Sequence, residues 1–290
     1  MRPRISVVVN TRNEEQSLPY ALRSVASWAD EIVVVDMEST DGTLAVARAF
    51  GARTFTVEPA GYVEPARAFA VAQATGDWIL VLDADELVPE SLSRRLRDIA
   101  AGDAADVVMC PYRTYILGAP LKGSGWGPRH ELHPRFYRRG YLSWSPEVHR
   151  APVPAPGARI VALQAGEPAE AAELAIHHFN YLGFGDFLDR LNRYTSIEAA
   201  EAAARGESVS LLRGFARAGR ELLWRLVKDR GFRDGWRGVY LSTLMGVYRL
   251  VVSAKQHQLR TVGSEEEIEA GYVREAERLL ATYPEGAHRT

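Results

Sequence analysis

The first part of the chain alternates between short apolar runs and longer segments in which apolar residues recur with helical spacing. The runs predicted as strands are Ile5–Val9, Glu31–Asp36, Ala52–Val57 and Trp78–Leu82, and the predicted helices between them are Glu14–Ser27, Thr40–Phe50 and Val63–Ala74. Strands that are apolar throughout and separated by helices are typical of parallel β-α-β units buried on both faces. The pattern predicts an α/β domain whose ligands bind beyond the carboxyl ends of the strands.

The pattern changes from Asp106 onward. Two predicted strands of mixed polarity, Val107–Tyr115 and Arg135–Arg138, enclose a loop rich in Gly and Pro. Four helices are predicted beyond His177: Phe184–Arg205, Leu211–Asp229, Asp234–His257 and Glu265–Thr282. We therefore expect a catalytic domain over residues 1–180, with a donor half at about 1–105 and an acceptor half at about 106–180, and a helical region over 181–290.

Composition narrows the class of protein. The 290 residues are 47% hydrophobic and 25% charged, with a formal net charge of -2, as in ordinary globular proteins, and this charge gives no reason to expect nucleic-acid binding. The single cysteine, Cys110, excludes an intramolecular disulfide, fits a reducing compartment and is predicted to fill the core. Neither a secretory signal nor an apolar run of roughly 18 residues is visible, so we expect a cytoplasmic protein, compatible with the inner face of the cytoplasmic membrane.

Carboxylates follow the predicted strand Trp78–Leu82 directly, in the sequence Asp83-Ala84-Asp85. Unpaired carboxylates beside a buried strand are costly unless a cation or another partner compensates their charge. Oxygen ligands suit Mg²⁺ or Mn²⁺, and such an ion also binds phosphates. In the alternative interpretation, these residues lie at a helix N-terminus, where Asp85 or Glu86 only caps the turn that precedes Pro89.

Two further loops follow predicted strands. Asp36 ends the second strand, where its carboxylate is placed to accept hydrogen bonds from a ligand, whereas Ser39, Thr40 or Asp41 is the expected cap of the next helix. The loop after the first strand, Asn10–Glu14, either caps its own helix or faces a nucleotide.

Three segments carry a resemblance to a known family. Val7–Glu15, Ile32–Thr43 and Gly76–Glu86 resemble family 2 glycosyltransferases with the GT-A fold. Three later segments are similar to the branch with lipopolysaccharide-core glycosyltransferases and peptide S-glycosyltransferases: Trp144–Arg150, His178–Tyr181 and Phe232–Trp236.

The resemblance implies a GT-A (nucleotide-diphospho-sugar transferase, Rossmann-like) domain with a C-terminal α-helical extension. It also implies an inverting enzyme that moves a sugar from a nucleoside-diphosphate sugar, expected to be UDP-linked, to a cell-envelope or lipid-linked glycan or a peptide. Asp36 would hold the uracil or ribose, and Asp85, near Asp83, would anchor a Mn²⁺ or Mg²⁺ ion that bridges the diphosphate. The expected donor contacts are Asn10, Thr11, Arg12, Glu14, Asp36, Arg67, Asp83, Ala84 and Arg135.

Two positions depart from the branch. Arg67-Ala68 stands where the branch has Arg-Asn, so Arg67 is either a donor contact or a surface charge. Arg150 stands where the branch has an acid, which makes Glu147 the candidate catalytic base, or else a solvent-facing turn carboxylate.

Two basic side chains near these positions have open roles. His149 is a possible metal ligand, a phosphate contact or a core histidine. Arg135 either steadies the diphosphate or is a strand-edge charge.

The segment 211–237 has eight basic and three acidic residues, with leucine and aromatic residues on the other side of its helix. A basic amphipathic helix is the pattern for docking on an anionic membrane surface. The alternative is a helix packed on the catalytic domain with a solvated basic face. The apolar run Val239–Ala254 is expected to pack inside the tail or in a homo-oligomer interface.

Two other functions remain open. A sugar nucleotidyltransferase also uses strand-end carboxylates, but the loop Asn10–Glu14 has no glycine for a phosphate-binding turn. A non-catalytic nucleotide-sugar-binding or membrane-associated scaffold is suggested by the missing acid at Arg150.

Overall fold

The computed structural model describes residues 2–128, 131–145, 151–163 and 173–283. The chain forms two compact units, Met1–Asp186 with Arg225–Val239, and Phe187–Trp224 with Tyr240–Thr290. The segment Arg225–Val239 therefore belongs to the unit with the α/β domain, although the sequence places it in the helical region. The functional division into donor and acceptor halves stays a prediction.

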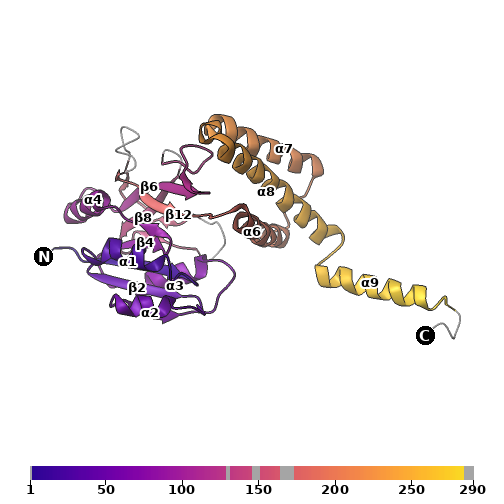
Figure 1. Ribbon diagram of the computed structural model, residues 1–290, viewed down its shortest axis with the longest axis horizontal. Coiled ribbons are helices and arrows are strands. Elements are labelled where there is room, and N and C mark those ends of the chain that lie inside the picture. The colour runs from indigo at the N-terminus through magenta and orange to yellow at the C-terminus, as the bar shows by residue number, and fades with distance from the viewer. Residues whose placement is uncertain (1, 129–130, 146–150, 164–172, 284–290) are drawn as a thin grey trace. The chain divides into compact units, whose positions relative to one another are not determined.

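The first unit is built on a mixed sheet with the strand order β3-β2-β1-β4-β8-β6-β12-β5 (Figure 1). Its first four neighbours are the parallel strands β3 (Arg53–Thr56), β2 (Glu31–Asp36), β1 (Ile5–Thr11) and β4 (Trp78–Asp83). The helices that connect them are α1 (Leu18–Ala26), α2 (Thr43–Ala49) and α3 (Glu64–Gln73). This arrangement confirms the predicted β-α-β series, with element ends that differ by a few residues.

Alternate residues of the parallel strands enter two separate cores, which explains why these strands are apolar throughout. Val7, Val9 and Leu80 pack with α1 and α4 (Glu90–Ala101) on one face, and Val8 and Val81 pack with α3 on the other. Cys110 lies in the first core, as predicted, and burial raises the pKa of its thiol to about 12.

Helix α1 begins at Leu18 rather than at the predicted Glu14. Asn13 adopts a left-handed backbone conformation with φ 54°, and the amides of Ser17 and Leu18 donate to the carbonyl of Glu14 in a turn. Pro19 follows in the first turn of the helix, where its missing N–H costs nothing. The residues before Leu18 are thereby left as a loop beside the strand ends.

The second half of the sheet brings distant segments to the end of β4. Strand β8 (Leu132–Arg138) runs antiparallel between β4 and the long strand β6 (Val107–Ile116), so Arg135 lies inside the sheet. Beyond β6, β12 (Ile176–Phe179) runs parallel to it and pairs with β5 (Glu86–Leu87). Short strands complete the described part: β7 (Ala119–Pro120), β9 (Leu142–Ser143), β10 (Val153–Pro154) and β11 (Ile160–Ala162).

The second unit is helical, as predicted. It contains most of α6 (Phe184–Ala204), α7 (Leu211–Leu223), most of α8 (Gly235–Thr261) and α9 (Glu265–Leu280). The predicted helix Leu211–Asp229 changes to a π-helical turn at Trp224–Lys228, after which a short 3-10 helix at Gly231–Asp234 leads into α8. None of the described helices combines the length and the apolar character needed to cross a bilayer.

We predict that Gly76→Ala destabilises the sheet by about 1–3 kcal/mol. A Cβ at Gly76 would lie 2.7 Å from Ser6 Oγ and 2.9 Å from the Arg4 carbonyl oxygen, so β1 and β4 would have to shift. The urea midpoint measures the loss. Gly183→Ala, where nothing lies within 4 Å of the new Cβ, is the control, and equal midpoints for both variants would contradict the prediction.

Candidate functional site

The polar residues predicted to bind a ligand end three adjacent strands. In the register of the sheet, Asn10 lies beside Asp83, and Thr11 lies beside Asp36. Because β1, β2 and β4 are parallel, their carboxyl ends meet at one edge of the sheet. The structure therefore brings the first-strand loop, Asp36 and Asp83 together as the sequence predicted.

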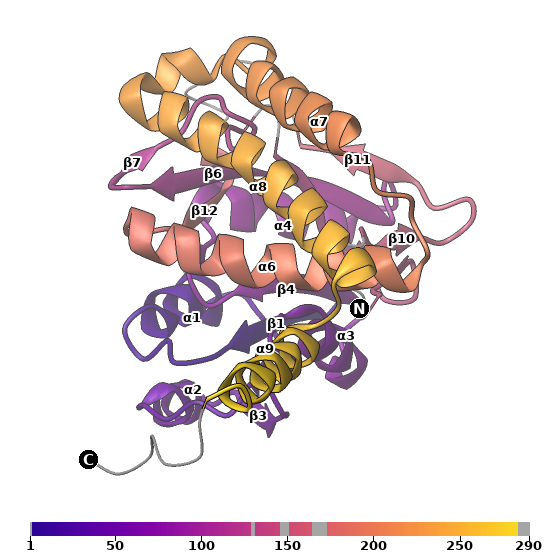
Figure 2. The ribbon, with the colours of Figure 1, turned by 90° about the vertical axis from the view of Figure 1, so that its right-hand side faces the viewer.

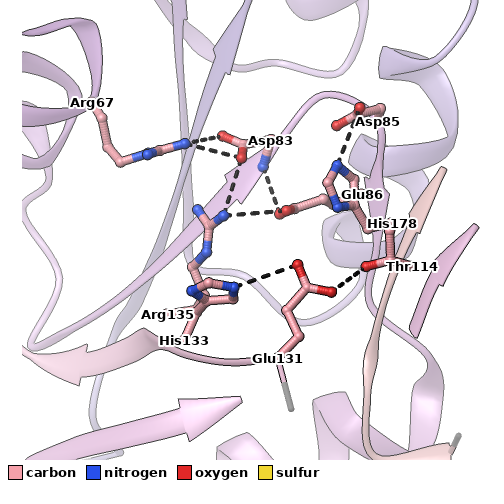
Figure 3. Close-up of polar contacts among 9 residues, drawn as sticks. All are labelled: Arg67, Asp83, Asp85, Glu86, Thr114, Glu131, His133, Arg135 and His178. Atoms are coloured by element: carbon pink, nitrogen blue, oxygen red, sulfur yellow. Dashed lines mark hydrogen bonds and ion pairs between the residues drawn. The ribbon is translucent and has the colours of Figure 1, made fainter. Parts of the chain in front are cut away.

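Two arginines hold the carboxylate of Asp83 (Figure 3). Arg67 Nη2 donates to both of its oxygens, at 2.7 and 3.0 Å, and Arg135 Nη2 donates to Oδ2 at 3.1 Å. Burial alone would raise the pKa of Asp83, but the charges of Arg67 and Arg135 outweigh it and hold that pKa well below its usual range. Asp83 is therefore an ionised carboxylate whose charge is already balanced by protein groups.

Glu86 closes the turn after β4 from inside. Its side chain is fully buried, accepts the backbone N–H of Asp83 at 2.8 Å, and lies 3.3 Å from Arg135 Nη2. Burial raises the pKa of Glu86, Arg135 opposes that rise, and the neighbouring Asp83 carboxylate adds to it. Helix α4 begins only at Glu90, after Pro89, so neither Asp85 nor Glu86 caps the helix itself, although Glu86 closes the turn before Pro89 by accepting the Asp83 N–H.

The structure also decides whether Arg67 and Arg135 are surface or strand-edge charges. Arg67 is only 9% exposed and lies over the Trp144 ring, so the surface-charge interpretation is wrong. Arg135 lies between two strands over the ring of Tyr112 and is not an edge charge. Contact of either arginine with a donor stays a prediction.

Asp85 differs from Asp83 because no arginine engages it within the described residues. Its Oδ2 lies 3.5 Å from Nε2 of His178, which β12 places beside β5. Burial disfavours the charged imidazole, but the hydrogen bond and charge of Asp85 outweigh it and raise the pKa of His178 to about 9. The second ring nitrogen, Nδ1, is buried without a partner among the described residues.

The residues present fit a divalent cation at Asp85. A carboxylate oxygen and the nitrogen of a neutral imidazole are ligands for Mn²⁺, so the ion would have to displace the proton that Asp85 favours on His178, and Mg²⁺ accepts carboxylates together with phosphate oxygens. The described residues include no cluster of three or more His, Cys, Asp or Glu side chains able to hold a metal, so phosphate or water oxygens would have to complete the coordination. Direct ligation by Asp83 stays a prediction, and it would compete with the two arginines.

Unsatisfied polar atoms gather around this edge of the sheet. They are both polar atoms of the Asn10 side chain, Thr11 Oγ1, Arg67 Nε, Arg135 Nη1 and His178 Nδ1, all buried and without a hydrogen-bond partner in the described part of the chain. Buried polar groups are normally paired, because leaving one unpaired costs about 1–3 kcal/mol. A polar ligand at the strand ends would find partners here.

The remaining donor-site predictions divide into buried and exposed residues. Asp36 is fully buried and accepts hydrogen bonds from the backbone N–H and the hydroxyl of Ser39, which leaves its contact with a ligand a prediction. Ala84 is buried, Arg12 is exposed and Glu14 is partly buried. The backbone N–H of Glu14 donates to Thr43 Oγ1 at 2.8 Å, so this loop also binds the start of α2.

On the acceptor side, the predicted base Glu147, His149 and Arg150 lie outside the described residues. Another carboxylate on that side is Glu131, which accepts the Thr114 hydroxyl at 2.6 Å and lies 3.5 Å from His133 Nε2 (Figure 3). Thr114 is in register with His178, so this pair adjoins the Asp85 site.

A segment from beyond the sheet holds the loop that leads to Glu131. The carboxylate of Asp234 accepts the backbone N–H groups of Lys122 and Gly123, at 2.7 and 3.0 Å, and the hydroxyl of Ser124 at 3.1 Å. Arg225 donates to the Ser124 carbonyl at 2.7 Å and lies over the Trp126 ring. The Asp-Gly element of the tail is thus part of the first unit.

Sequence reasoning gave no site role to Glu86, Glu131, His178 or Asp234. His178 and Asp234 lie in segments that resemble the family, and that resemblance was the available signal. Glu131 lies in an aperiodic loop, and neither its neighbours nor its spacing pointed to the site.

We predict that Arg135→Met costs about 3–5 kcal/mol of stability, because it leaves Glu86 buried without its cation. Glu86→Gln should cost less, because an amide oxygen can still accept the Asp83 N–H. The double variant should then lose less stability than the two single variants lose together. Urea denaturation of the wild type and the three variants measures this coupling. Strict additivity would contradict the pairing.

We predict that Asp234→Ala loosens the loop Lys122–Ser124. The variant removes the acceptor of two amides and a hydroxyl, so amide hydrogen exchange in this loop should become at least tenfold faster. Asp98→Ala, at an exposed position of α4, is the control. Unchanged exchange at Lys122 and Gly123 would contradict the role of Asp234.

Comparison with known proteins identifies the family. The family model "Glycosyl transferase family 2" matches residues 6–162. An uncharacterized glycosyltransferase of Rickettsia typhi is 26% identical over 88% of this chain and 87% of its own length. LpsC, a lipopolysaccharide core biosynthesis glycosyltransferase of Rhizobium meliloti, is 25% identical over 88% of this chain and 92% of its own.

Among solved structures, glucosyl-3-phosphoglycerate synthase of Mycobacterium tuberculosis with Mg²⁺ and UDP is 28% identical, with a TM-score of 0.33. That likeness covers 38% of this chain and spans 44% of the synthase. The match to the family covers more than half of the 290 residues and includes β1, β2 and β4 with their polar ends. The strand-end cluster and this match lead to one conclusion: the chain has a GT-A α/β domain with a helical C-terminal region, and it belongs to glycosyl transferase family 2.

Proposed function

We propose that the protein is an inverting glycosyltransferase that moves a sugar from a nucleoside-diphosphate sugar, UDP-linked, to a cell-envelope or lipid-linked glycan acceptor. The observation that carries the proposal is the difference between the partners of the two carboxylates at the end of β4, Asp83 and Asp85. Two arginines balance Asp83, whereas Asp85 lies beside His178 and no arginine of the described residues engages it.

In this proposal Asp85 and His178 would hold a Mn²⁺ or Mg²⁺ ion, which would neutralise the charge that develops on the diphosphate leaving group. Arg67 and Arg135 each keep a buried N–H group without a partner in the described part of the chain, which supports a role in orienting donor phosphates. The carboxylate of Asp83 holds the guanidinium groups of Arg67 and Arg135 in place. Asn10, Thr11 and Asp36 would receive the nucleoside at the neighbouring strand ends.

Inversion by direct displacement requires a base that takes the proton of the acceptor nucleophile. Glu147 remains our candidate for that base, and His149, two residues later in the sequence, is our candidate for a further ligand of the cation. Arg150, where the branch has an acid, favours one competing function, a nucleotide-sugar-binding scaffold without turnover.

We predict that one nucleotide sugar, in the presence of Mn²⁺, raises the melting temperature of the wild-type chain by several degrees. A ligand at about a hundred times its Kd adds about 2.7 kcal/mol to the stability of the folded state. A panel of UDP-, GDP- and dTDP-sugars, each with Mn²⁺ or with EDTA, measures the shift. Asp85→Ala should abolish both the Mn²⁺-dependent shift and sugar transfer, and Asp98→Ala should retain both.

Full activity of Asp85→Ala would contradict the proposed site. Tight Mn²⁺-dependent binding of a donor by the wild-type chain, without hydrolysis or transfer to any of a panel of acceptors, would favour the scaffold instead. A melting temperature that no nucleotide sugar changes would contradict both functions.

A further inference from the structure

Helix α7 packs on α8 within the second unit (Figure 2), and the contacts between the two helices include small residues. A Cβ at Gly214 would lie 2.6 Å from Ser253 Oγ, and a Cβ at Gly246 would lie 3.0 Å from the Ala218 carbonyl oxygen. Glu221, farther along α7, lies 3.7 Å from Arg249 Nε. The small residues and the ion pair fix which side of α7 faces α8.

A second side of α7 exposes large apolar residues. Leu211 is 66% exposed, Leu212 84%, Phe215 58% and Leu223 61%. At 100° per residue these four positions fall within one arc of the helix, next to the side that packs on α8. Large apolar side chains on one continuous face of a helix mark an interaction site rather than scattered surface residues.

The third side of α7 is basic. Arg213, Arg217 and Arg220 are exposed and follow the helix one turn apart, along the edge of the apolar arc. None of the three has an ion-pair partner among the residues that the structure describes, whereas Glu221, the acid of this helix, faces Arg249. The helix therefore presents an apolar strip bordered by uncompensated positive charge.

Two other basic residues of segment 211–237 differ from these arginines because they contact the protein itself. Arg225 donates to the Ser124 carbonyl, and Arg237 Nε donates to the Leu117 carbonyl at 2.9 Å, so both are engaged with the loop of the first unit. On α7, by contrast, all three arginines are exposed and lie along exposed apolar residues.

We propose that the exposed apolar and basic faces of α7 dock on an anionic lipid bilayer, with the helix lying in the plane of the interface. Leu212 and Phe215 enter the boundary between headgroups and acyl chains, and Arg213, Arg217 and Arg220 contact lipid phosphates. The surface goes beyond the proposed reaction and does not depend on it. It would hold the enzyme beside acceptors that are themselves embedded in the membrane.

Charge favours a bilayer over a second copy of the chain as the occupant of this face. Two α7 helices packed through their apolar strips would place like-charged arginine rows along the same border. Helix α9 provides the contrast, because it exposes Tyr272 (74%) and Val273 (52%) but carries six glutamates and two arginines. An anionic surface would repel that helix.

Sedimentation of the full-length chain with vesicles tests the proposal. The chain should bind vesicles of phosphatidylcholine in which phosphatidylglycerol replaces about a third of the lipid, and bind weakly to phosphatidylcholine alone. Leu212→Ser with Phe215→Ser should reduce binding at least tenfold. Replacing the three arginines by Gln should weaken it on the order of a hundredfold, at roughly fivefold for each charge, and remove its salt dependence.

The matched control is Tyr272→Ser with Val273→Ser on α9, which should bind like the wild type. Equal urea midpoints for all variants exclude misfolding as the cause of lost binding. The proposal is overturned if the Leu212 and Phe215 variant binds vesicles like the wild type. It is also overturned if light scattering shows that this variant converts a dimer to a monomer while vesicle binding is unchanged. No donor or acceptor is present, so either result leaves the proposed glycosyl transfer untouched.

Discussion

The ion pair between Asp83 and its two arginines is the contact on which the candidate site depends. A carboxylate at the end of a buried strand is stable only if its charge is matched, and Arg67 from α3 and Arg135 from β8 supply that match. Arg135 also contacts Glu86, whose carboxylate holds the turn after β4 by accepting the Asp83 N–H. With that turn fixed, Asp85 lies beside His178, the place that we propose for a cation and a diphosphate.

The segment predicted to bind the acceptor is also held in place by contacts within the first unit. The loop before β8 is held by Asp234 and Arg225, which come from a segment far along the chain. The loop ends at Glu131, and Glu131 contacts Thr114 on the strand that pairs with β12. The helical tail therefore contributes to the catalytic unit and is more than an appendage, while α7 keeps a face of its own for contact elsewhere.

The local pattern of the sequence was sufficient for the sheet and for the position of the carboxylates. Uniformly apolar strands required burial on both faces, and the polar residues after β1, β2 and β4 had to meet at one edge. The partners of those carboxylates were less predictable, because Arg67 and Arg135 lie 16 and 52 residues from Asp83 and no periodicity links them. Burial, which separates a donor-site arginine from a surface arginine, is a property of the assembled sheet. Glu131 was missed for the same reason.

A crystal structure of the chain with UDP and Mn²⁺, with anomalous scattering used to locate the ion, tests the central claim most directly. We expect Mn²⁺ within roughly 2.2 Å of an Asp85 carboxylate oxygen, while Asp83 keeps its contacts with Arg67 and Arg135. A manganese ion bound to Asp83, with both arginines displaced, would contradict it.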